Sequence, residues 1–221
     1  DAVIQKSLPL IELLDPRQDM AILAASIYGN PEAKLQITGV TGTNGKTTVT
    51  SLLYQIFEAA DRDCGLIGTI ETRIGKDVIE SSRTTPEATD LQALAATMRE
   101  RHMRHLVMEV SSHAVSLHRV QGAHFAFVGF TNLTQDHLDF HGDMENYFAA
   151  KRKLFTSERT RAAVVNVDDP HGHLLQTEAV VPTSSYSLSA VSNVKISAST
   201  VSLTWKNLDI RLPIGGSFAV M

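Results

Sequence analysis

The chain has 221 residues, of which 43% are hydrophobic and 20% charged, and its formal net charge is -4 at pH 7. This is the composition of a soluble globular protein, and the length allows one large α/β domain or one domain with a piece of another. With this net charge, the sequence gives no indication of a basic surface that would bind nucleic acid. No apolar run reaches the ~18 residues of a membrane span. Cys64 is the only cysteine. No intrachain disulfide can therefore form, and a cytoplasmic location is expected.

The first thirty residues predict a short strand and then a helix. Residues 8–14 (LPLIELL) have the apolar character of a strand, and the helix is expected after the DPR that follows. Its apolar face is expected to comprise Met20, Ile22, Leu23 and Ile27. Gly29, Asn30 and Pro31 then interrupt the pattern, which indicates a domain boundary near residue 30.

From residue 31 to about residue 167, apolar strand-like segments alternate with helix-like ones. The expected strands are 35–40, 65–70, 76–80, 105–110, 125–130 and 162–167. The expected helices are 46–60, one that starts at Thr85-Pro86 with the threonine as its cap, and 144–155. This alternation predicts an α/β fold with a mostly parallel sheet and helices on both faces. Beyond about residue 183, alternating apolar residues (VKISASTVSLTWKNLDIRL) predict a small region of antiparallel hairpins.

Residues 41–48 (TGTNGKTT) have the features of a phosphate-binding loop. They lie between a buried strand and a helix, where backbone N–H groups and the helix dipole can face a phosphate. In the pattern G-x-x-x-x-G-K-[ST], Lys46 would reach the β and γ phosphates and the Thr47 hydroxyl would bind magnesium. Val40 stands where this pattern has its first glycine, which argues against ordinary GTPases and kinases more than against nucleotide binding. The alternative is a glycine-rich turn with an incidental GKT.

Glu109 falls at the carboxyl end of the strand 105–110, which is expected to lie beside the strand that leads into the loop. In open α/β sheets, ligands bind at this edge. A carboxylate there can hold magnesium directly or through water. The alternative is a solvated glutamate at the end of a strand.

Residues 131–142 (TNLTQDHLDFHG) gather acidic and imidazole side chains after another buried strand. These side chains are Asp136, His137, Asp139 and His141. No cysteine lies nearby and there is no H-E-x-x-H, so the carboxylates fit a hard cation at a phosphate site better than zinc. We interpret His141 as an ordinary hydrogen-bonded loop residue, whereas the neighbours of His137 match a family pattern.

Several motifs, in this order, resemble those of the Mur ligases. They are VTGTNGKTTVTS, SRTTPEATDLQ, MEVSSHAVSLHRVQG, FTNLTQDHLDFHGDMENYFAAKRKLF and VVNVDDP. In that family TGTNGKTT is the normal nucleotide loop, so Val40 is a family feature. The resemblance, over about residues 7–221, implies the family's central ATP-binding domain in 31–221, truncated at its C-terminal end. It implies that residues 1–30 are the tail of an N-terminal UDP-binding domain with its linker, and that a C-terminal domain is absent.

The resemblance also implies roles for individual residues. The ATP loop would comprise Gly42, Thr43, Asn44, Gly45, Lys46, Thr47 and Thr48. Magnesium would be bound by Thr47, Glu109, His137 and Lys151, the lysine as N6-carboxylysine. The muramoyl-dipeptide substrate would be held by Thr84, Thr85, Ser111 and Arg119. The catalytic residues would be Lys46, His137 and Lys151. Leu117 departs from relatives whose glutamine touches the substrate, because leucine cannot supply that hydrogen bond.

Lys151 would need a special environment, because an ordinary ammonium beside magnesium repels it. Addition of CO2 to the neutral amine gives a carbamate, an oxygen ligand like a carboxylate. This requires a lysine whose pKa is lowered in a partly buried, cationic site. Its neighbours Arg152 and Lys153 are expected to be solvated.

The implied activity is that of an ATP-dependent acid–amino-acid ligase in peptidoglycan biosynthesis. Through an acyl phosphate it would add the third amino acid, meso-diaminopimelate or L-lysine, to UDP-N-acetylmuramoyl-L-alanyl-D-glutamate. We expect a cytoplasmic monomer that uses ATP and Mg2+, without nucleic-acid partners or membrane insertion. Another Mur ligase or folylpolyglutamate synthase would share the loop and the chemistry with a different acceptor. A fragment or regulatory protein that binds nucleotide without turnover is the alternative outside the enzymes.

Overall fold

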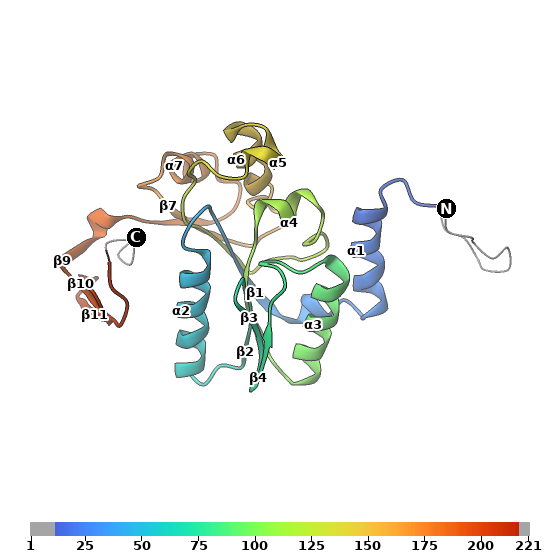
Figure 1. The fold of residues 1–221 in the computed structure, drawn as a ribbon, viewed down its shortest axis with the longest axis horizontal. Coiled ribbons are helices and arrows are strands. Elements are labelled where there is room, and N and C mark those ends of the chain that lie inside the picture. Colours follow the sequence, from blue (N-terminus) through green and yellow to red (C-terminus); the bar gives the residue numbers. More distant parts are fainter. Residues whose placement is uncertain (1–11, 217–221) are drawn as a thin grey trace.

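A computed structural model describes residues 12–216, which form an eight-stranded sheet between helices and a separate three-stranded sheet (Figure 1). The strands of the large sheet are β1 (Gln36–Thr41), β2 (Cys64–Ile67), β3 (Glu71–Ile74), β4 (Asp77–Glu80), β5 (His105–Glu109), β6 (Phe127–Phe130), β7 (Ala163–Asn166) and β8 (Thr183–Tyr186). Those of the small sheet are β9 (Val191–Ile196), β10 (Val201–Trp205) and β11 (Leu208–Leu212). The helices are α1 (Pro16–Ile27), α2 (Lys46–Ala59), α3 (Ala88–Glu100), α4 (Ser112–Ser116), α5 (Leu138–His141), α6 (Met144–Arg152) and α7 (Pro170–Thr177), with short 3-10 turns η1 (Pro31–Lys34) and η2 (Leu188–Ala190). Within 12–216, no helix is long and apolar enough to cross a membrane.

The large sheet is parallel except at one edge. Its strand order is β4-β3-β2-β5-β1-β6-β7-β8, and the pairs from β2 to β8 run parallel while β3 and β4 add an antiparallel hairpin. The predicted mostly parallel sheet and the antiparallel region near the C-terminus are both confirmed. The prediction of hairpins from residue 183 is wrong for 183–186, because β8 pairs in parallel with β7. The chain reaches β8 through α7, so this is a strand–helix–strand crossover.

The helix α7 was not predicted, although the sequence carries its start signal. Asp169 is its cap and accepts a hydrogen bond from the His171 backbone N–H, and Pro170 occupies the first helical position. The short helices α4 and α5 were also missed, because four or five residues are too few to show a helical period.

The central strand β5 is buried on both faces and β1 largely so, whereas β6 leaves Phe127 51% exposed on one face. Ile37, Leu106 and Val128 are at most 1% exposed. Burial on both faces explains why a strand such as β5 appears as a continuous apolar run in the sequence. The helix α2 lies on one side of the sheet and α3 on the other (Figure 1). On the α3 side, a Cβ on Gly65 would lie 2.5 Å from the sulfur of Met98, so the glycine permits close packing. This arrangement brings the carboxyl ends of three neighbouring strands to one edge.

The predicted apolar face of α1 is wrong. Its buried residues are Ala21, Ala24 and Ala25, which share helical spacing and the side of α1 that contacts α3. The larger side chains of the predicted face are exposed, namely Met20, Ile22, Leu23 and Ile27. The alanines allow two helix backbones to approach closely, which bulkier side chains would prevent. Of the strand predicted at 8–14, residues 8–11 lie outside the described part, and 12–14 are not in a strand.

The helix α3 begins later than predicted. Its cap is Glu87, and neither Thr85 nor Pro86 belongs to the helix. The Thr85 hydroxyl instead donates to the backbone oxygen of Glu109 at 2.9 Å and accepts from the Ser111 backbone N–H at 3.1 Å. The sequence pattern therefore predicted a helix cap at Thr85, whereas in the structure the Thr85 side chain connects this segment to the end of β5.

Candidate functional site

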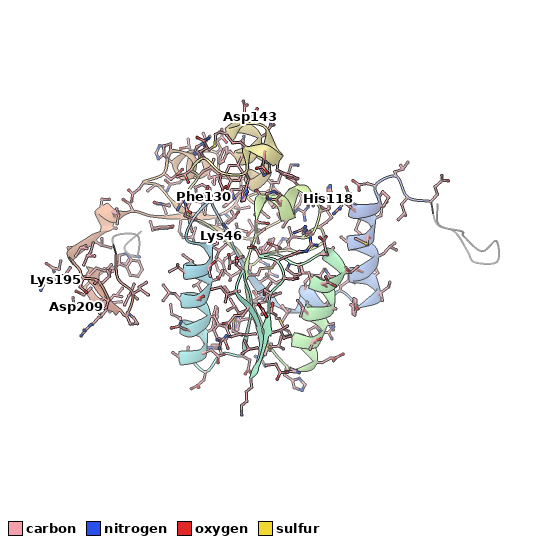
Figure 2. All side chains as sticks on the ribbon, in the orientation of Figure 1. Lys46, His118, Phe130, Asp143, Lys195 and Asp209 are labelled. Carbon is pink, nitrogen blue, oxygen red and sulfur yellow. The ribbon has the colours of Figure 1, made fainter. Side chains whose placement is uncertain are left out.

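Segments that follow β1, β5 and β6 converge at the carboxyl edge of the sheet. The predicted phosphate loop comes after β1, Glu109 ends β5, and residues 131–137 come after β6. Because β5 and β6 pair with β1 on either side, these segments are neighbours in space. Lys46 lies at this end of α2, toward the side of the molecule where α4 to α7 lie (Figure 2). This is the edge at which open α/β sheets bind ligands.

The loop between β1 and α2 needs its glycines. Gly42 has φ +145°, and a Cβ there would lie 1.9 Å from the Thr131 hydroxyl oxygen. Gly45 has φ +86° and is the N-cap of α2. The Thr131 hydroxyl donates to the Asn44 backbone oxygen at 2.6 Å, so the segment after β6 braces the loop. The result is a fixed backbone turn at the start of a 14-residue helix, the geometry that favours an anion.

Lys46 folds back over the loop. Its ammonium donates to the backbone oxygens of Gly42, at 3.0 Å, and Thr43, at 2.8 Å. Burial lowers the pKa of Lys46, while the carboxylates of Glu109 and Asp136 act in the opposite direction. The remaining loop residues line the same turn, and Thr47 and Thr48 are half-buried in the first turn of α2.

Lys151 is buried beside Lys46, although α6 is far away in the sequence. Its side chain is 1% exposed, and its ammonium donates to the backbone oxygen of Gly42 at 3.0 Å. Burial, and then the charge of Lys46, lowers the pKa of Lys151 from 10.5 to about 7, against a smaller opposite effect of Asp136. The ammonium also lies 4.6 Å from the centre of the Tyr147 ring. Arg152 and Lys153 are exposed as predicted, so of these three neighbours only Lys151 is buried.

Glu109 is 1% exposed, which rules out the alternative of a solvated glutamate. Its two carboxylate oxygens accept hydrogen bonds from Thr69, one from the backbone N–H at 2.8 Å and one from the hydroxyl at 3.0 Å. The Thr69 and Thr84 hydroxyl oxygens lie 3.1 Å apart. Thr69 was not predicted as a site residue. Its position directly after β2, the neighbour of β5, is the signal that points to it.

The four residues predicted to hold a substrate lie together. Arg119 donates to the Thr85 backbone oxygen at 3.3 Å and pairs with Glu87 at 2.9 Å, while the Ser111 hydroxyl caps α4 by accepting from the Ala114 N–H. The Arg119 Nε is buried without a hydrogen-bond acceptor among residues 12–216.

His137 belongs to a cluster of rings near Lys151. It has φ +53° and lies 4.7 Å, ring centre to ring centre, from His113 and 6.1 Å from Tyr147. Its side chain is 44% exposed and pairs with Asp136 at 3.4 Å. His141 shares a hydrogen bond with the Ser112 hydroxyl at 2.9 Å, as predicted for a hydrogen-bonded residue, but it ends α5 and does not lie in a loop.

The part of the chain in view, 12–216, holds no cluster of three or more His, Cys, Asp or Glu side chains able to bind a metal by themselves. A magnesium site here would combine Glu109 with His137, the Thr47 hydroxyl and phosphate oxygens. This matches the preference of Mg2+ for one or two carboxylates with substrate phosphates.

Comparisons with known proteins agree with this geometry. Residues 40–221 match the family model described as Mur ligase middle domain. The chain is 53% identical over 180 residues to the UDP-N-acetylmuramoyl-L-alanyl-D-glutamate--2,6-diaminopimelate ligase of Streptomyces coelicolor, covering 81% of this chain and 35% of that protein. It is 41% identical over 219 residues to the ligase of the same name from Geobacter metallireducens, covering 96% of this chain and 43% of that protein.

Solved structures are similar as well. A structure of a ligase with that name has a TM-score of 0.80 at 27% identity, covering 95% of this chain and 46% of that one. A Mycobacterium tuberculosis folylpolyglutamate synthase complexed with ADP has a TM-score of 0.69 at 16% identity, covering 94% of this chain and 56% of that one, a likeness of fold alone. The chain thus spans less than half the length of the curated relatives named above. Since the family model covers residues 40–221, the chain belongs to the Mur ligase family.

Proposed function

We propose that this chain is the ATP-binding part of a ligase that joins 2,6-diaminopimelate to UDP-N-acetylmuramoyl-L-alanyl-D-glutamate. Residues 31–221 would form the central domain, and 1–30 would belong to a preceding UDP-binding domain and linker. The names of the Streptomyces and Geobacter relatives favour 2,6-diaminopimelate over L-lysine as the incoming amino acid. We further propose that the enzyme acts in the cytoplasm as a monomer.

The observation that carries the proposal is the pair of lysines at one end of the phosphate loop. The ammonium groups of Lys46 and Lys151 both donate to the backbone oxygen of Gly42, with the buried Glu109 acting on Lys46. When protonated, a buried and a half-buried amine that share one carbonyl are poorly neutralised by protein alone. Such a site favours a polyanion such as the phosphates of ATP.

The reaction would proceed in two steps. An oxygen of the substrate's terminal carboxylate attacks the γ-phosphorus of ATP, and the bond to the β,γ-bridging oxygen breaks to release ADP and leave an acyl phosphate. The neutral amine of the amino acid then attacks the acyl carbon, phosphate leaves, and the nitrogen loses a proton to give the amide. Because two anions must meet in the first step, Lys46 would contribute by neutralising charge and aligning the γ-phosphate.

Bound Mg2+ would neutralise phosphate charge during this step. The residues that would hold it are Thr47, Glu109, His137 and a carboxylated Lys151. With a pKa of about 7, the Lys151 amine is neutral in a large fraction of molecules at neutral pH. The neutral amine attacks CO2, loses a proton and becomes a carbamate anion. This change converts the repulsion between Lys46 and Lys151 into an attraction.

The substrate would lie over the segment that joins β4 to α3 and over α4. Arg119, as a guanidinium, is suited to bind a carboxylate of the muramoyl-dipeptide, and Thr84, Thr85 and Ser111 offer hydroxyl groups. Leu117, at the C-terminal end of α4, offers only apolar contact.

Two measurements test the proposal. Calorimetry on the 221-residue chain should detect binding of ATP with Mg2+, and Lys46→Ala should abolish it. Ligation is tested in a chimera in which the part of this chain that matches over 180 residues replaces the corresponding part of the Streptomyces coelicolor enzyme. The chimera should form product with 2,6-diaminopimelate and the muramoyl-dipeptide. Turnover with L-lysine instead would correct the amino acid, and turnover only with a folate or another muramoyl precursor would contradict the acceptor. Binding without any turnover would support a nucleotide-binding module.

A further inference from the structure

Thr69 forms hydrogen bonds to the carboxylate of Glu109 through two different groups. Its backbone N–H donates to one carboxylate oxygen at 2.8 Å and its hydroxyl lies 3.0 Å from the other. The turn leaves space for this contact because residue 68 is glycine: a Cβ on Gly68 would lie 2.8 Å from a carboxylate oxygen of Glu109. Two bonds from one residue restrict both the position and the rotation of the carboxylate.

The hydroxyl of Thr69 also connects Glu109 to Thr84. A threonine hydroxyl has a single proton, and an ionised carboxylate can only accept. The Thr69 hydroxyl is the donor in both contacts, toward the Glu109 carboxylate at 3.0 Å and toward the Thr84 hydroxyl at 3.1 Å, so its single proton serves one of them at a time. Thr69 therefore lies between Glu109 and Thr84 and can bond either.

Core packing does not account for Thr69. The residue is exposed, whereas the Glu109 side chain that it contacts is 1% exposed. An exposed threonine contributes little apolar burial. Its hydroxyl nevertheless points to the one buried carboxylate at this edge that the proposed function uses.

We propose that Thr69 is a positioning residue that fixes Glu109 for a divalent cation and links it to Thr84 on the substrate side. The inference rests on the proposed function, in which Glu109 holds Mg2+ and Thr84 contacts the muramoyl-dipeptide. Partners that orient metal-binding side chains in this way typically change metal affinity by about ten- to a hundredfold when removed.

Three variants of the 221-residue chain separate positioning from folding. Thr69→Val keeps the backbone N–H and the branched shape but removes the hydroxyl, and Thr69→Ser restores the hydroxyl. Thr72→Val is the matched control, because the Thr72 hydroxyl bonds Ser81 at 3.2 Å and has no contact with Glu109. Urea unfolding of each variant establishes that it is folded.

The probe is Mn2+ in the presence of ATP, followed by electron paramagnetic resonance of the free ion. Thr69→Val should weaken Mn2+ binding by about ten- to a hundredfold, while Thr69→Ser and Thr72→Val stay within about threefold of the unaltered chain. Equal Mn2+ affinity in Thr69→Val and the unaltered chain would overturn the positioning role and leave the proposed function standing. Failure of Thr69→Ser to recover affinity would overturn it as well. An unaltered chain that binds no Mn2+ with ATP would overturn both proposals.

Discussion

Replacing Lys151 by methionine should change how the stability of the protein depends on pH. The Lys151 pKa is about 7 in the folded chain, against an ordinary value of 10.5. Between these values the unfolded chain binds more protons, so the free energy of unfolding rises with pH. The loss of stability caused by burying the protonated Lys151 amine is fully present below pH 7 and disappears as the pH approaches 10.5.

The magnitude follows from the size of this shift. One pKa unit corresponds to about 1.36 kcal/mol, so a shift from 10.5 to about 7 corresponds to roughly 5 kcal/mol when Lys151 is fully protonated. Between pH 7 and pH 9, titration of Lys151 alone should raise the free energy of unfolding by about 2 kcal/mol. Methionine removes the titration, and the Gly42 oxygen keeps the hydrogen bond from Lys46.

Urea unfolding in CO2-depleted buffer measures this effect. At pH 7 the Lys151→Met variant should be more stable than the unaltered chain, and the difference should shrink by about 2 kcal/mol by pH 9. The exposed Lys153→Met is the matched control and should follow the unaltered chain at every pH. Adding bicarbonate at pH 8 should stabilise the unaltered chain but not Lys151→Met, because only the lysine can form a carbamate. A stability difference that stays constant from pH 7 to pH 9 would refute the lowered pKa.

Three other substitutions, one of them compared with a control at Gly142, test the loop and the substrate side. In the chimera, Lys46→Ala should lower the ligation rate by at least about a hundredfold without lowering the melting temperature, and near-normal turnover would contradict its role. Gly42→Ala should lower the free energy of unfolding by roughly 2–5 kcal/mol, because φ is +145° and a Cβ would meet Thr131 at 1.9 Å. Gly142→Ala, with φ +83° and no atom within 4 Å, should cost only about 1–2 kcal/mol, so equal losses would argue against the clash. Arg119→Lys in the chimera should raise the KM for the muramoyl-dipeptide about tenfold or more with little change in kcat, and an unchanged KM would remove it from the substrate site.

Much of the fold could be predicted because its signals are local. The strand β5 is buried on both faces and therefore appears as an apolar run in the sequence. The segment of β6 is equally apolar, although Phe127 is exposed. The loop before α2 was recognisable because a strand, glycines and Gly45-Lys46-Thr47 follow one another directly. The same kind of local signal gave a wrong prediction at Thr85-Pro86. This sequence is typical of a helix cap, but the Thr85 hydroxyl donates to the backbone oxygen of Glu109.

Local signals could not decide which face of a helix is buried when both faces carry apolar residues. In α1 the alanines at positions 21, 24 and 25 have the same period as the larger side chains on the other face. The choice depends on the space that α3 leaves, and this is a property of the packed helix pair.

The sequence by itself determined the class of fold, the nucleotide loop and the residues that resemble those of the family, because each depends on neighbours within a dozen positions. Only the tertiary structure decided that Lys151 is buried while Lys153 is exposed, and that Thr69 holds Glu109. Lys151 and Gly42 are 109 positions apart, and Thr69 and Glu109 are 40 apart. Side chains so distant in the sequence meet only after the parallel strands have paired, because the order of strands in the sheet, and not the order along the chain, sets which loops are neighbours.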